Sequence, residues 1–455
     1  WPGQWRCDFV SEGKSSRISG GFEKADFVMR PGEEVRSPLN VVMNYSGGWE
    51  RAQNIWRSFM RNCNMPRNVR PMHVASSSLW FGEMTRADAE SQKLFIDRYK
   101  EEGFDLRYWW MDAGWYPCRG EWPLTGTWEP DASRFPKGLK EVCDHARKNG
   151  AGTIVWFEPE RVGDPLSRLA TEHPEWLLGG VLLNLGDPAC LRWLIGHVGG
   201  LIEKEGIDVY RQDFNIAPAS YWRAADAPGR RGITEIKYVM GYLAFWDALL
   251  ERFPGLLIDA CASGGQRNDL ETMRRAVPLL RSDSAGDPLG EQNHSYGINY
   301  WLPYSGTVSN SYDEYGIRSC FAPSFNSLWD MRRKDCDYGA LRECLRLLSE
   351  EAAPFFEGDY YPLTPYGLGN DIWTVFQFHK PADGKGVLLA FRREGCPDNT
   401  VEVRLRDLRK NGVYKVRDTD TGEIREIKGS QLMAGFRIKR NEKRASAVIA
   451  FELAR

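Results

Sequence analysis

Acidic side chains stand at the ends of several short apolar runs in this sequence. Asp112, Glu158, Asp213 and Asp283 each close such a run. The end of a buried strand is an expensive place for a charge, so carboxylates that recur there indicate a site rather than a core. Carboxyl groups in one pocket can serve as nucleophile, general acid and general base.

One of these runs ends in Arg211-Gln-Asp213-Phe-Asn215, the most informative stretch of the chain. Side chains of a strand alternate between its two faces, so these three polar residues are expected on one face. A buried arginine beside a buried aspartate keeps the carboxylate ionised, as a nucleophile must be. Arg281 and Asp283 repeat the spacing, and we expect them to face the same way.

Aromatic residues accompany the carboxylates. Trp110 and Trp156 stand two positions before Asp112 and Glu158, which places a ring one layer below each acid. The chain holds 18 Trp, 18 Tyr and 21 Phe. This is more tryptophan than a hydrophobic core needs, which suggests that some of the rings form platforms in a pocket that accepts sugar rings. Any single acid could instead be a structural ion pair, but the recurrence argues for function. Two such carboxyl groups, one ionised and one protonated, are what retaining glycoside hydrolysis requires.

The elements that position these residues follow a strict alternation from about residue 70 onward. Eight apolar runs separated by helices, over about 260 residues, match the number and size of a (β/α)8 barrel, whose catalytic groups lie at the C-terminal ends of its strands. An open doubly wound sheet is the alternative, and no Gly-x-Gly-x-x-Gly sequence opens the first helix to support it. The expected strands are Met72–Ser78, Leu106–Asp112, Thr153–Glu158, Ile207–Asp213, Leu256–Cys261, Pro278–Asp283, Ile298–Tyr304 and Gly316–Pro323.

Capping residues mark several helix boundaries. Asp187 before Pro188 combines an N-cap with a proline at the first helical position, and Gly206 is expected to end that helix. Gly103 and Gly150 are expected to end two earlier helices.

The two ends of the chain differ from this pattern. Residues 1–65 contain a Pro-Gly turn and then a helix, and we interpret them as the tail of an N-terminal β domain with a linker helix. Residues 356–455 carry short strands separated by turn residues. The predicted fold class is α/β: a (β/α)8 TIM barrel over residues 66–355, a C-terminal antiparallel β-sandwich, and a remnant of an N-terminal β domain.

Composition excludes several function classes. With 60 basic and 62 acidic residues, the net charge of −2 gives no global case for binding nucleic acid or an anionic membrane. Apolar runs fall short of the ~20 residues that span a bilayer. Ten scattered cysteines and six isolated histidines predict neither a metal site nor a disulfide framework, and no cofactor is expected. The chain begins at Trp1 without a leader, which we interpret as processing or truncation; the expectation is a soluble protein, cytoplasmic or secreted or periplasmic.

Ordered motifs between residues 70 and 325 carry a resemblance to a known family. They are Trp110-Met-Asp-Ala-Gly-Trp115, Trp128-Glu-Pro-Asp131 with Phe135-Pro-Lys-Gly138, Trp156-Phe-Glu-Pro-Glu160 followed by His173-Pro-Glu-Trp176, Ile207-Asp-Val-Tyr-Arg-Gln-Asp-Phe-Asn215, Cys261-Ala-Ser-Gly-Gly-Gln-Arg267 and Arg281-Ser-Asp283. This set resembles the α-galactosidases of glycoside hydrolase family 36, the melibiase family. The segments Trp1–Trp5 and Pro31–Glu33 resemble the end of that family's N-terminal β domain.

The resemblance implies a retaining exo-α-glycosidase that uses no metal. Asp213 matches the family's nucleophile and Asp283 its acid/base. Cys261, Ser263, Gly264 and Gly265 match the loop that lines the sugar's 2-position, and Arg267 matches the arginine of that loop. Together with the residues singled out above, the expected substrate-binding set is Trp80, Asp112, Trp115, Trp156, Glu158, Arg211, Asn215, Cys261, Ser263, Gly264, Gly265 and Arg267.

Three positions depart from the family pattern. Ala113 stands where the family has a second aspartate, and the two family aspartates grip the 4- and 6-hydroxyls of galactose. Arg211 replaces the lysine that contacts the 3- and 4-hydroxyls, and Gln266 replaces a glycine of the 2-position loop. Losing a hydrogen-bonding carboxylate costs about 1–3 kcal/mol for a sugar that needs it. Either another residue supplies the contact, or the sugar differs from galactose.

Several functions therefore stay open. The first is hydrolysis of terminal α-galactosyl-type residues by double displacement, with α-galactosidase activity as the main expectation. The same mechanism on an α-N-acetylgalactosaminide, an α-galactosaminide or a β-L-arabinopyranoside is the alternative. A transglycosylase and a non-catalytic carbohydrate-binding relative remain, although the presence of both aspartates argues against the latter. Carbohydrate is the expected partner, and homo-oligomer formation is open.

Overall fold

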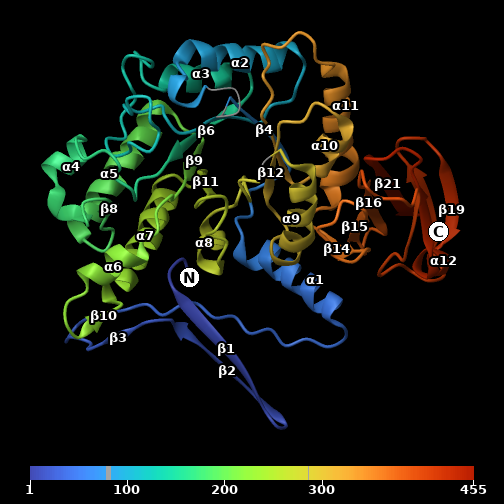
Figure 1. Cartoon of the computed structure of the whole chain (residues 1–455), viewed down its shortest axis with the longest axis horizontal. Coiled ribbons are helices and arrows are strands. Elements are labelled where there is room, and N and C mark those ends of the chain that lie inside the picture. Colours follow the sequence, from blue (N-terminus) through green and yellow to red (C-terminus); the bar gives the residue numbers. More distant parts are fainter. Residues whose placement is uncertain (78–82, 285, 455) are drawn as a thin grey trace. The chain divides into compact units, whose positions relative to one another are not determined.

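The computed structural model describes residues 1–77, 83–284 and 286–454 (Figure 1). The chain divides into two compact units, which are described separately here. Unit 1 comprises Trp1–Met43, Ser76–Asp97 and Arg107–Pro278, and unit 2 comprises Asn44–Ala75, Arg98–Leu106 and Leu279–Arg455. The predicted sugar contact Trp80 lies outside the described residues.

The described part of unit 1 is built on parallel strands in the order β11-β9-β6-β5. They are β5 (Tyr108–Met111), β6 (Gly152–Phe157), β9 (Val209–Gln212) and β11 (Leu257–Ala260). Almost all of their residues are buried, because strands of a parallel sheet are covered on both faces. All four overlap the runs predicted as strands, and these predictions are confirmed.

Helices α3 (Lys140–Lys148), α5 (Pro188–Glu205) and α7 (Ile233–Arg252) connect these strands, and α5 packs against α7. The Asp187 carboxylate accepts hydrogen bonds from the first free backbone N–H groups of α5, and Gly206 ends that helix at a φ of 73°. Both predicted caps are confirmed. The shorter elements of unit 1 are α4 (Arg168–Glu172), α6 (Ala219–Ala225), α8 (Leu270–Arg275), β7 (Leu177–Leu178), β8 (Leu182–Leu183) and the 3-10 turns Met84–Arg86 and Pro174–Trp176. Helix α2 (Ala89–Glu101) belongs to unit 1 as far as Asp97, and its last residues belong to unit 2.

The N-terminal part of unit 1 is β structure, as the sequence indicated. Strands β1 (Trp5–Glu12) and β2 (Ser15–Phe22) form an antiparallel hairpin, and β3 (Asp26–Phe27) pairs with β10 (Arg230–Arg231). The predicted Pro-Gly turn is present, but the chain after β3 forms no regular element before residue 49.

Three strand predictions were wrong, and two strands of unit 2 lie elsewhere in the sequence than predicted. Its parallel strands follow the order β12-β13-β4, with β4 at Met72–Ser76, β12 at Gly306–Ser309 and β13 at Ser324–Ser327. The segments Ile298–Tyr304 and Gly316–Pro323, predicted as strands, instead lie largely in α9 (Pro288–Trp301) and α10 (Glu314–Ser319), and Pro278–Asp283 forms no strand. The real strands read Gly-Thr-Val-Ser and Ser-Phe-Asn-Ser: they are fully buried yet polar, so hydrophobicity does not reveal them.

The remaining helices of unit 2 include two that continue as π-helix. Helix α1 (Trp49–Phe59) leads into a π-helical turn at Met60–Asn64, and α11 (Tyr338–Leu347) leads into another at Leu348–Ala352, followed by the 3-10 turn Ala353–Phe355.

The C-terminal part of unit 2 is the predicted antiparallel β-sandwich. One sheet has the order β14-β15-β16-β21-β18-β19, and β17 pairs with β20 in the other. A core of apolar side chains such as Val375, Leu388 and Ile449 fills the space between the sheets. The strands are β14 (Asp359–Pro362), β15 (Trp373–Lys380), β16 (Lys385–Arg392), β17 (Thr400–Val403), β18 (Val413–Asp418), β19 (Ile424–Lys428), β20 (Phe436–Lys439) and β21 (Ala445–Leu453), with α12 at Gly429–Ala434.

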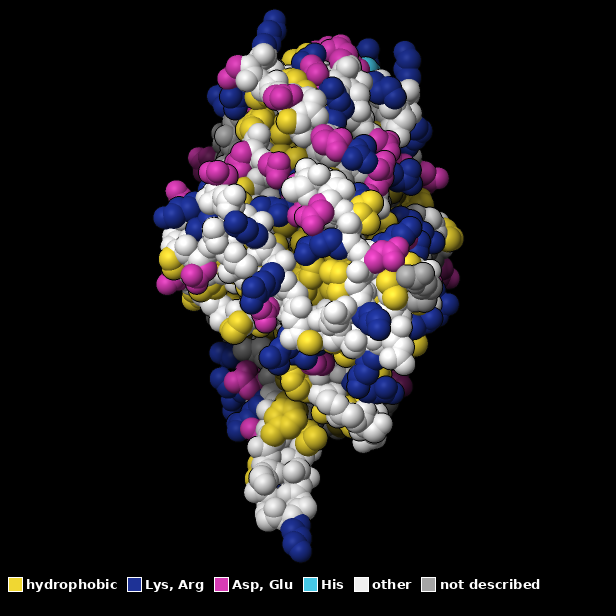
Figure 2. Space-filling view, turned by 90° about the vertical axis from the view of Figure 1, so that its right-hand side faces the viewer, with side chains coloured by type: hydrophobic (Ala, Val, Ile, Leu, Met, Phe, Trp, Pro, Cys, Tyr) yellow, Lys and Arg dark blue, Asp and Glu magenta, His cyan; other side chains and the backbone are white. Residues whose placement is uncertain are grey.

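Surface charge is mixed rather than segregated. On the face shown in Figure 2, Lys and Arg side chains alternate with Asp and Glu side chains, and no region of a single sign stands out. Within the described ranges, no helix combines the length and the apolar character needed to cross a lipid bilayer.

Candidate active site

The centre of the site is an arginine held inside the parallel sheet of unit 1. Arg211 of β9 lies directly opposite Asp259 of β11, and its Nη1 donates a hydrogen bond to Asp259 Oδ2. Its guanidinium carbon lies 4.2 Å from the ring centre of Trp110. Burial alone would lower the pKa of Arg211, but the charge of Asp259 raises it above its ordinary value. The sheet therefore contains a permanent cation beside Asp213.

Asp213 follows β9 directly and is surrounded by hydrogen-bond donors. Its Oδ1 accepts from the backbone N–H of Phe214 at 2.7 Å and from those of Ala262 and Ser263 at 3.1 Å each. Its Oδ2 accepts from Trp156 Nε1 at 3.1 Å. Burial would raise the pKa of Asp213, but the charge of Arg211 and, among these hydrogen bonds, that from Phe214 hold the pKa below its ordinary value. Asp213 is therefore ionised at neutral pH.

The loop after β11 presents its backbone N–H groups to Asp213 because of an unusual conformation. Ala262, Ser263, Gly264 and Gly265 have φ values of 131°, 45°, 79° and 86°. Glycine adopts such angles freely, whereas they strain alanine and serine. Successive N–H groups on such a turn form a concave anion-binding surface. Here the anion is the Asp213 carboxylate.

Polar contacts join the two loops that flank this carboxylate. Ser263 Oγ donates to the Asn215 side-chain oxygen at 2.9 Å, and its distance from the Phe214 carbonyl oxygen is 3.2 Å. Asn215 also helps to lower the pKa of Asp213. Cys261 is buried, and burial raises the pKa of its thiol to about 12, so it is a neutral group beside the carboxylate.

Glu158 and Trp115 were predicted as sugar contacts, and both side chains are buried and hydrogen-bonded to other residues of the protein. Glu158 is fully buried and accepts hydrogen bonds from the Asn215 backbone N–H and the Arg161 guanidinium. Burial raises its pKa despite the opposing charge of Arg161. Trp115 is also buried and donates from Nε1 to the Trp156 carbonyl at 2.7 Å.

Asp112 and Ala113 lie at the end of β5. The Ala113 backbone N–H donates to Asp112 Oδ1 at 2.6 Å, and the Ala113 side chain is buried. Asp112 and Trp115 help to line a small cavity of about 10 Å³. The charge of Asp112 helps to raise the pKa of Arg211, whose own charge lowers the pKa of Asp213.

Arg267 differs most from its predicted environment. Sequence reasoning assigned it to the sugar, but its guanidinium is buried and forms an ion pair with Glu160, its Nη1 and Nη2 facing the two carboxylate oxygens. Neither Glu160 nor Asp259 was singled out from the sequence. An acidic residue inside or just after a buried strand, as in Leu-Ile-Asp-Ala, is the signal that would have found them.

Asp283 belongs to unit 2, in the segment that leads to α9. Its side chain is exposed, whereas Arg281 is buried and its Nη2 donates to Glu291 Oε2 and Ser295 Oγ at 2.8 Å each. The predicted strand is absent here, so the alternation that would put Arg281 and Asp283 on one face does not apply. Burial raises the pKa of Glu291 despite the charge of Arg281.

No group of three or more His, Cys, Asp or Glu side chains among the described residues is arranged to hold a metal ion. The ten cysteines all carry free thiols.

The comparisons with known proteins all point to one family. The sequence model of the Melibiase family matches residues 36–311. The α-galactosidase Mel36A of Lactobacillus acidophilus is 24% identical over 299 residues, which cover 62% of this chain and 40% of that protein. The probable α-galactosidase C of Aspergillus terreus is 25% identical over 489 residues, covering 96% and 62%. The chain thus spans less than half the length of the Lactobacillus relative.

Solved structures show the same fold. The GH36 α-galactosidase AgaA of Geobacillus stearothermophilus superposes with a TM-score of 0.85 at 18% identity, covering 99% of this chain and 66% of that one. A variant of AgaA in complex with stachyose gives a TM-score of 0.84 at 19% identity, covering 96% and 64%. The predicted fold class, a TIM barrel followed by a β-sandwich, is confirmed. Since the family match extends over more than half of its residues, this chain belongs to the melibiase family.

Proposed function

We propose that the chain is a retaining exo-α-glycosidase that removes terminal α-galactosyl-type residues, with Asp213 as nucleophile and Asp283 as acid/base. The observation that carries this proposal is the environment of Asp213: four hydrogen-bond donors and the Arg211 cation hold one buried carboxylate ionised and oriented. A nucleophile in glycoside hydrolysis needs both properties.

The reaction proceeds in two balanced steps. In the first, a carboxylate oxygen of Asp213 bonds to the anomeric carbon while the glycosidic bond breaks and Asp283 gives its proton to the leaving oxygen. In the second, Asp283 takes a proton from water, the water oxygen bonds to the anomeric carbon, and the ester to Asp213 breaks. Two inversions return the sugar with its original α configuration.

Unused donors in unit 1 suit a polyhydroxylated ligand. Trp110 Nε1 and Arg211 Nε are buried and have no hydrogen-bond partner among the residues that the structure describes. A buried N–H without a partner is costly unless a ligand satisfies it. Sugar hydroxyls, which accept as well as donate, can satisfy these groups and bond to Asp112 at the same site.

The relatives suggest the sugar class. Curated relatives bear the name α-galactosidase, and AgaA variants were solved with raffinose and stachyose. A second candidate is the same mechanism on a modified sugar. Ala113 favours a β-L-arabinopyranoside, which lacks the 6-hydroxyl that the absent aspartate would hold, and Gln266 in the 2-position loop favours an α-N-acetylgalactosaminide or an α-galactosaminide. We also propose that residues 66–355 form the catalytic part of the chain, residues 356–455 the sandwich, and residues 1–65 the remnant of a β domain with its linker helix.

The test is a screen of purified protein on aryl α-galactoside, α-galactosaminide, α-N-acetylgalactosaminide and β-L-arabinopyranoside. Turnover of at least one substrate, lost in Asp213→Ala, supports the proposal. Product configuration is read by NMR immediately after cleavage. Transfer of the sugar to another sugar in preference to water would identify a transglycosylase, and the absence of turnover on all four would favour a non-catalytic binding protein.

A further inference from the structure

We propose that the buried ion pair between Glu160 and Arg267 positions the nucleophile, and that Arg267 acts as a positioning residue rather than as a sugar contact. The inference rests on the proposed function, since it concerns the carboxylate that we assign as nucleophile. All the residues involved belong to unit 1.

Glu160 is the centre of a saturated polar cluster. Arg267 Nη1 and Nη2 donate to its Oε1 and Oε2 at 2.5 and 2.9 Å. Gln212 Nε2 donates to Oε1 at 2.7 Å, and the Tyr238 hydroxyl donates to Oε2 at 2.6 Å. The Glu160 carboxylate is fully buried, and these four hydrogen bonds compensate the loss of water. A buried pair with this degree of compensation has one well-defined geometry.

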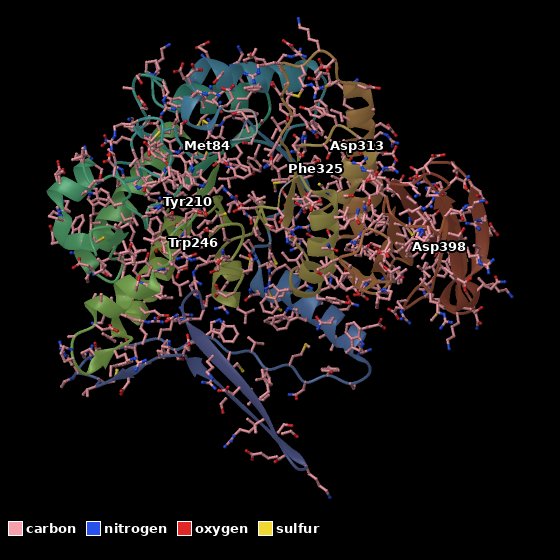
Figure 3. The ribbon with its side chains drawn as sticks, in the orientation of Figure 1. Met84, Tyr210, Trp246, Asp313, Phe325 and Asp398 are labelled. Atoms are coloured by element: carbon pink, nitrogen blue, oxygen red, sulfur yellow. The ribbon has the colours of Figure 1, made fainter. Side chains whose placement is uncertain are left out.

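The cluster holds both neighbours of Asp213 in the sequence. Gln212 precedes Asp213, and besides its bond to Glu160 its side-chain oxygen accepts from the Tyr210 hydroxyl at 2.9 Å and from Trp246 Nε1 at 2.6 Å (Tyr210 and Trp246 are labelled in Figure 3). On the other side of Asp213, the ring centre of Phe214 lies 4.0 Å from the Arg267 guanidinium carbon. The backbone on either side of the carboxylate is therefore tied to one ion pair.

The same pair anchors the loop that donates to Asp213. The loop leaves β11 at Ala260, passes through the strained residues Ala262 and Ser263, and reaches Arg267, whose guanidinium carbon also lies 4.5 Å from the ring centre of Tyr242. Strained backbone persists only where its surroundings hold it. With one end fixed by the sheet and the other by Arg267, the two N–H groups stay directed at Asp213.

The predicted consequence is a defect in the nucleophile rather than in sugar binding. In Glu160→Gln the carboxylate becomes an amide, which accepts from only one side, and the buried Arg267 loses its counter-ion. We expect kcat on an aryl glycoside to fall 10- to 100-fold with KM changed less than about threefold. The acid limb of kcat/KM should move to higher pH, because a carboxylate that loses N–H donors has a higher pKa.

The other ionisable groups that face Asp213 within unit 1 are unchanged in this variant: Arg211 on β9, Glu158 after β6 and Cys261 after β11. A matched control is Glu271→Gln, which removes another fully buried carboxylate of unit 1 from its ion pairs, here with Arg36 and with Arg275 of the same helix. Its stability should fall, but kcat and the pH profile should stay within twofold of the parent protein.

A second variant guards against loss of folding. Phe214→Leu keeps the ion pair but removes the aromatic ring that packs against Arg267. We expect kcat to fall in this variant too, by a smaller factor than in Glu160→Gln. A rise of tenfold or more in KM with kcat unchanged in Arg267→Lys would identify Arg267 as a sugar contact and overturn the inference. So would folded Glu160→Gln and Phe214→Leu proteins with the parent's kcat and pH profile.

One readout is independent of catalysis. Titration of the Asp213 carboxyl carbon by ¹³C NMR, assigned by its absence in Asp213→Asn, should show a higher pKa in Glu160→Gln than in the parent protein and in Glu271→Gln. If the parent protein turns over no glycoside but this shift is present, the proposed function fails and the positioning inference stands. An unshifted carboxyl overturns the inference even in an active enzyme.

Discussion

Replacing Asp259 by asparagine should destabilise unit 1 by leaving a buried cation without its counter-ion. Asp259 is fully buried and Arg211 is 2% exposed, so neither solvent nor salt can replace the lost charge. Breaking a buried ion pair on one side costs about 3–5 kcal/mol, and we expect the lower end, about 3 kcal/mol, because the asparagine oxygen still accepts a hydrogen bond. That figure is a change of roughly 100-fold in the ratio of folded to unfolded protein.

The assay is urea denaturation at pH 7 followed by tryptophan fluorescence, with calorimetry to test whether the units unfold together. The control removes both partners in Asp259→Leu with Arg211→Met. Apolar replacement of a whole buried pair is often neutral or stabilising, so the double variant should recover much of the loss. A loss below 0.5 kcal/mol in the single variant, or a double variant no more stable than the single one, would refute the reasoning about an uncompensated charge.

Further predictions concern turnover. Asp213→Ala should abolish it, and azide should restore a slow reaction that yields the inverted β product; retention of a tenth of the activity would contradict the nucleophile assignment. Asp283→Ala should damage substrates with poor leaving groups most, measured over a series of aryl glycosides, and equal damage across the series would exclude the acid role. Ala113→Asp should improve turnover of a galactoside about 10- to 100-fold, with a smaller gain on a β-L-arabinopyranoside, which has no 6-hydroxyl, and no change on either sugar would remove the specificity argument. Because the pKa of Asp213 lies below its ordinary value of about 4, its ionisation should limit kcat/KM only below that pH, and activity should fall as pH drops through the lowered pKa.

The sequence alone determined the features that depend on local interactions. The caps of α5 at Asp187 and Gly206 were predictable because an N-cap and a left-handed glycine satisfy backbone groups within the helix itself. The parallel strands β5, β6, β9 and β11 were predictable because buried parallel strands lie in largely apolar stretches of sequence. The position of Asp213 just after such a strand, and the family motifs around it, followed from the same local reading.

Tertiary structure decided everything that depends on contacts between distant residues. Strands β12 and β13 are polar in sequence and become strands because neighbouring strands satisfy their backbone groups and bury their serine and threonine side chains. The partner of Arg211 is Asp259, 48 residues away, and that of Arg267 is Glu160, 107 residues away. A charged residue in a sequence shows only that it needs a partner. Which partner it finds, and whether it then contacts a ligand or another side chain, depends on how the chain brings distant strands together.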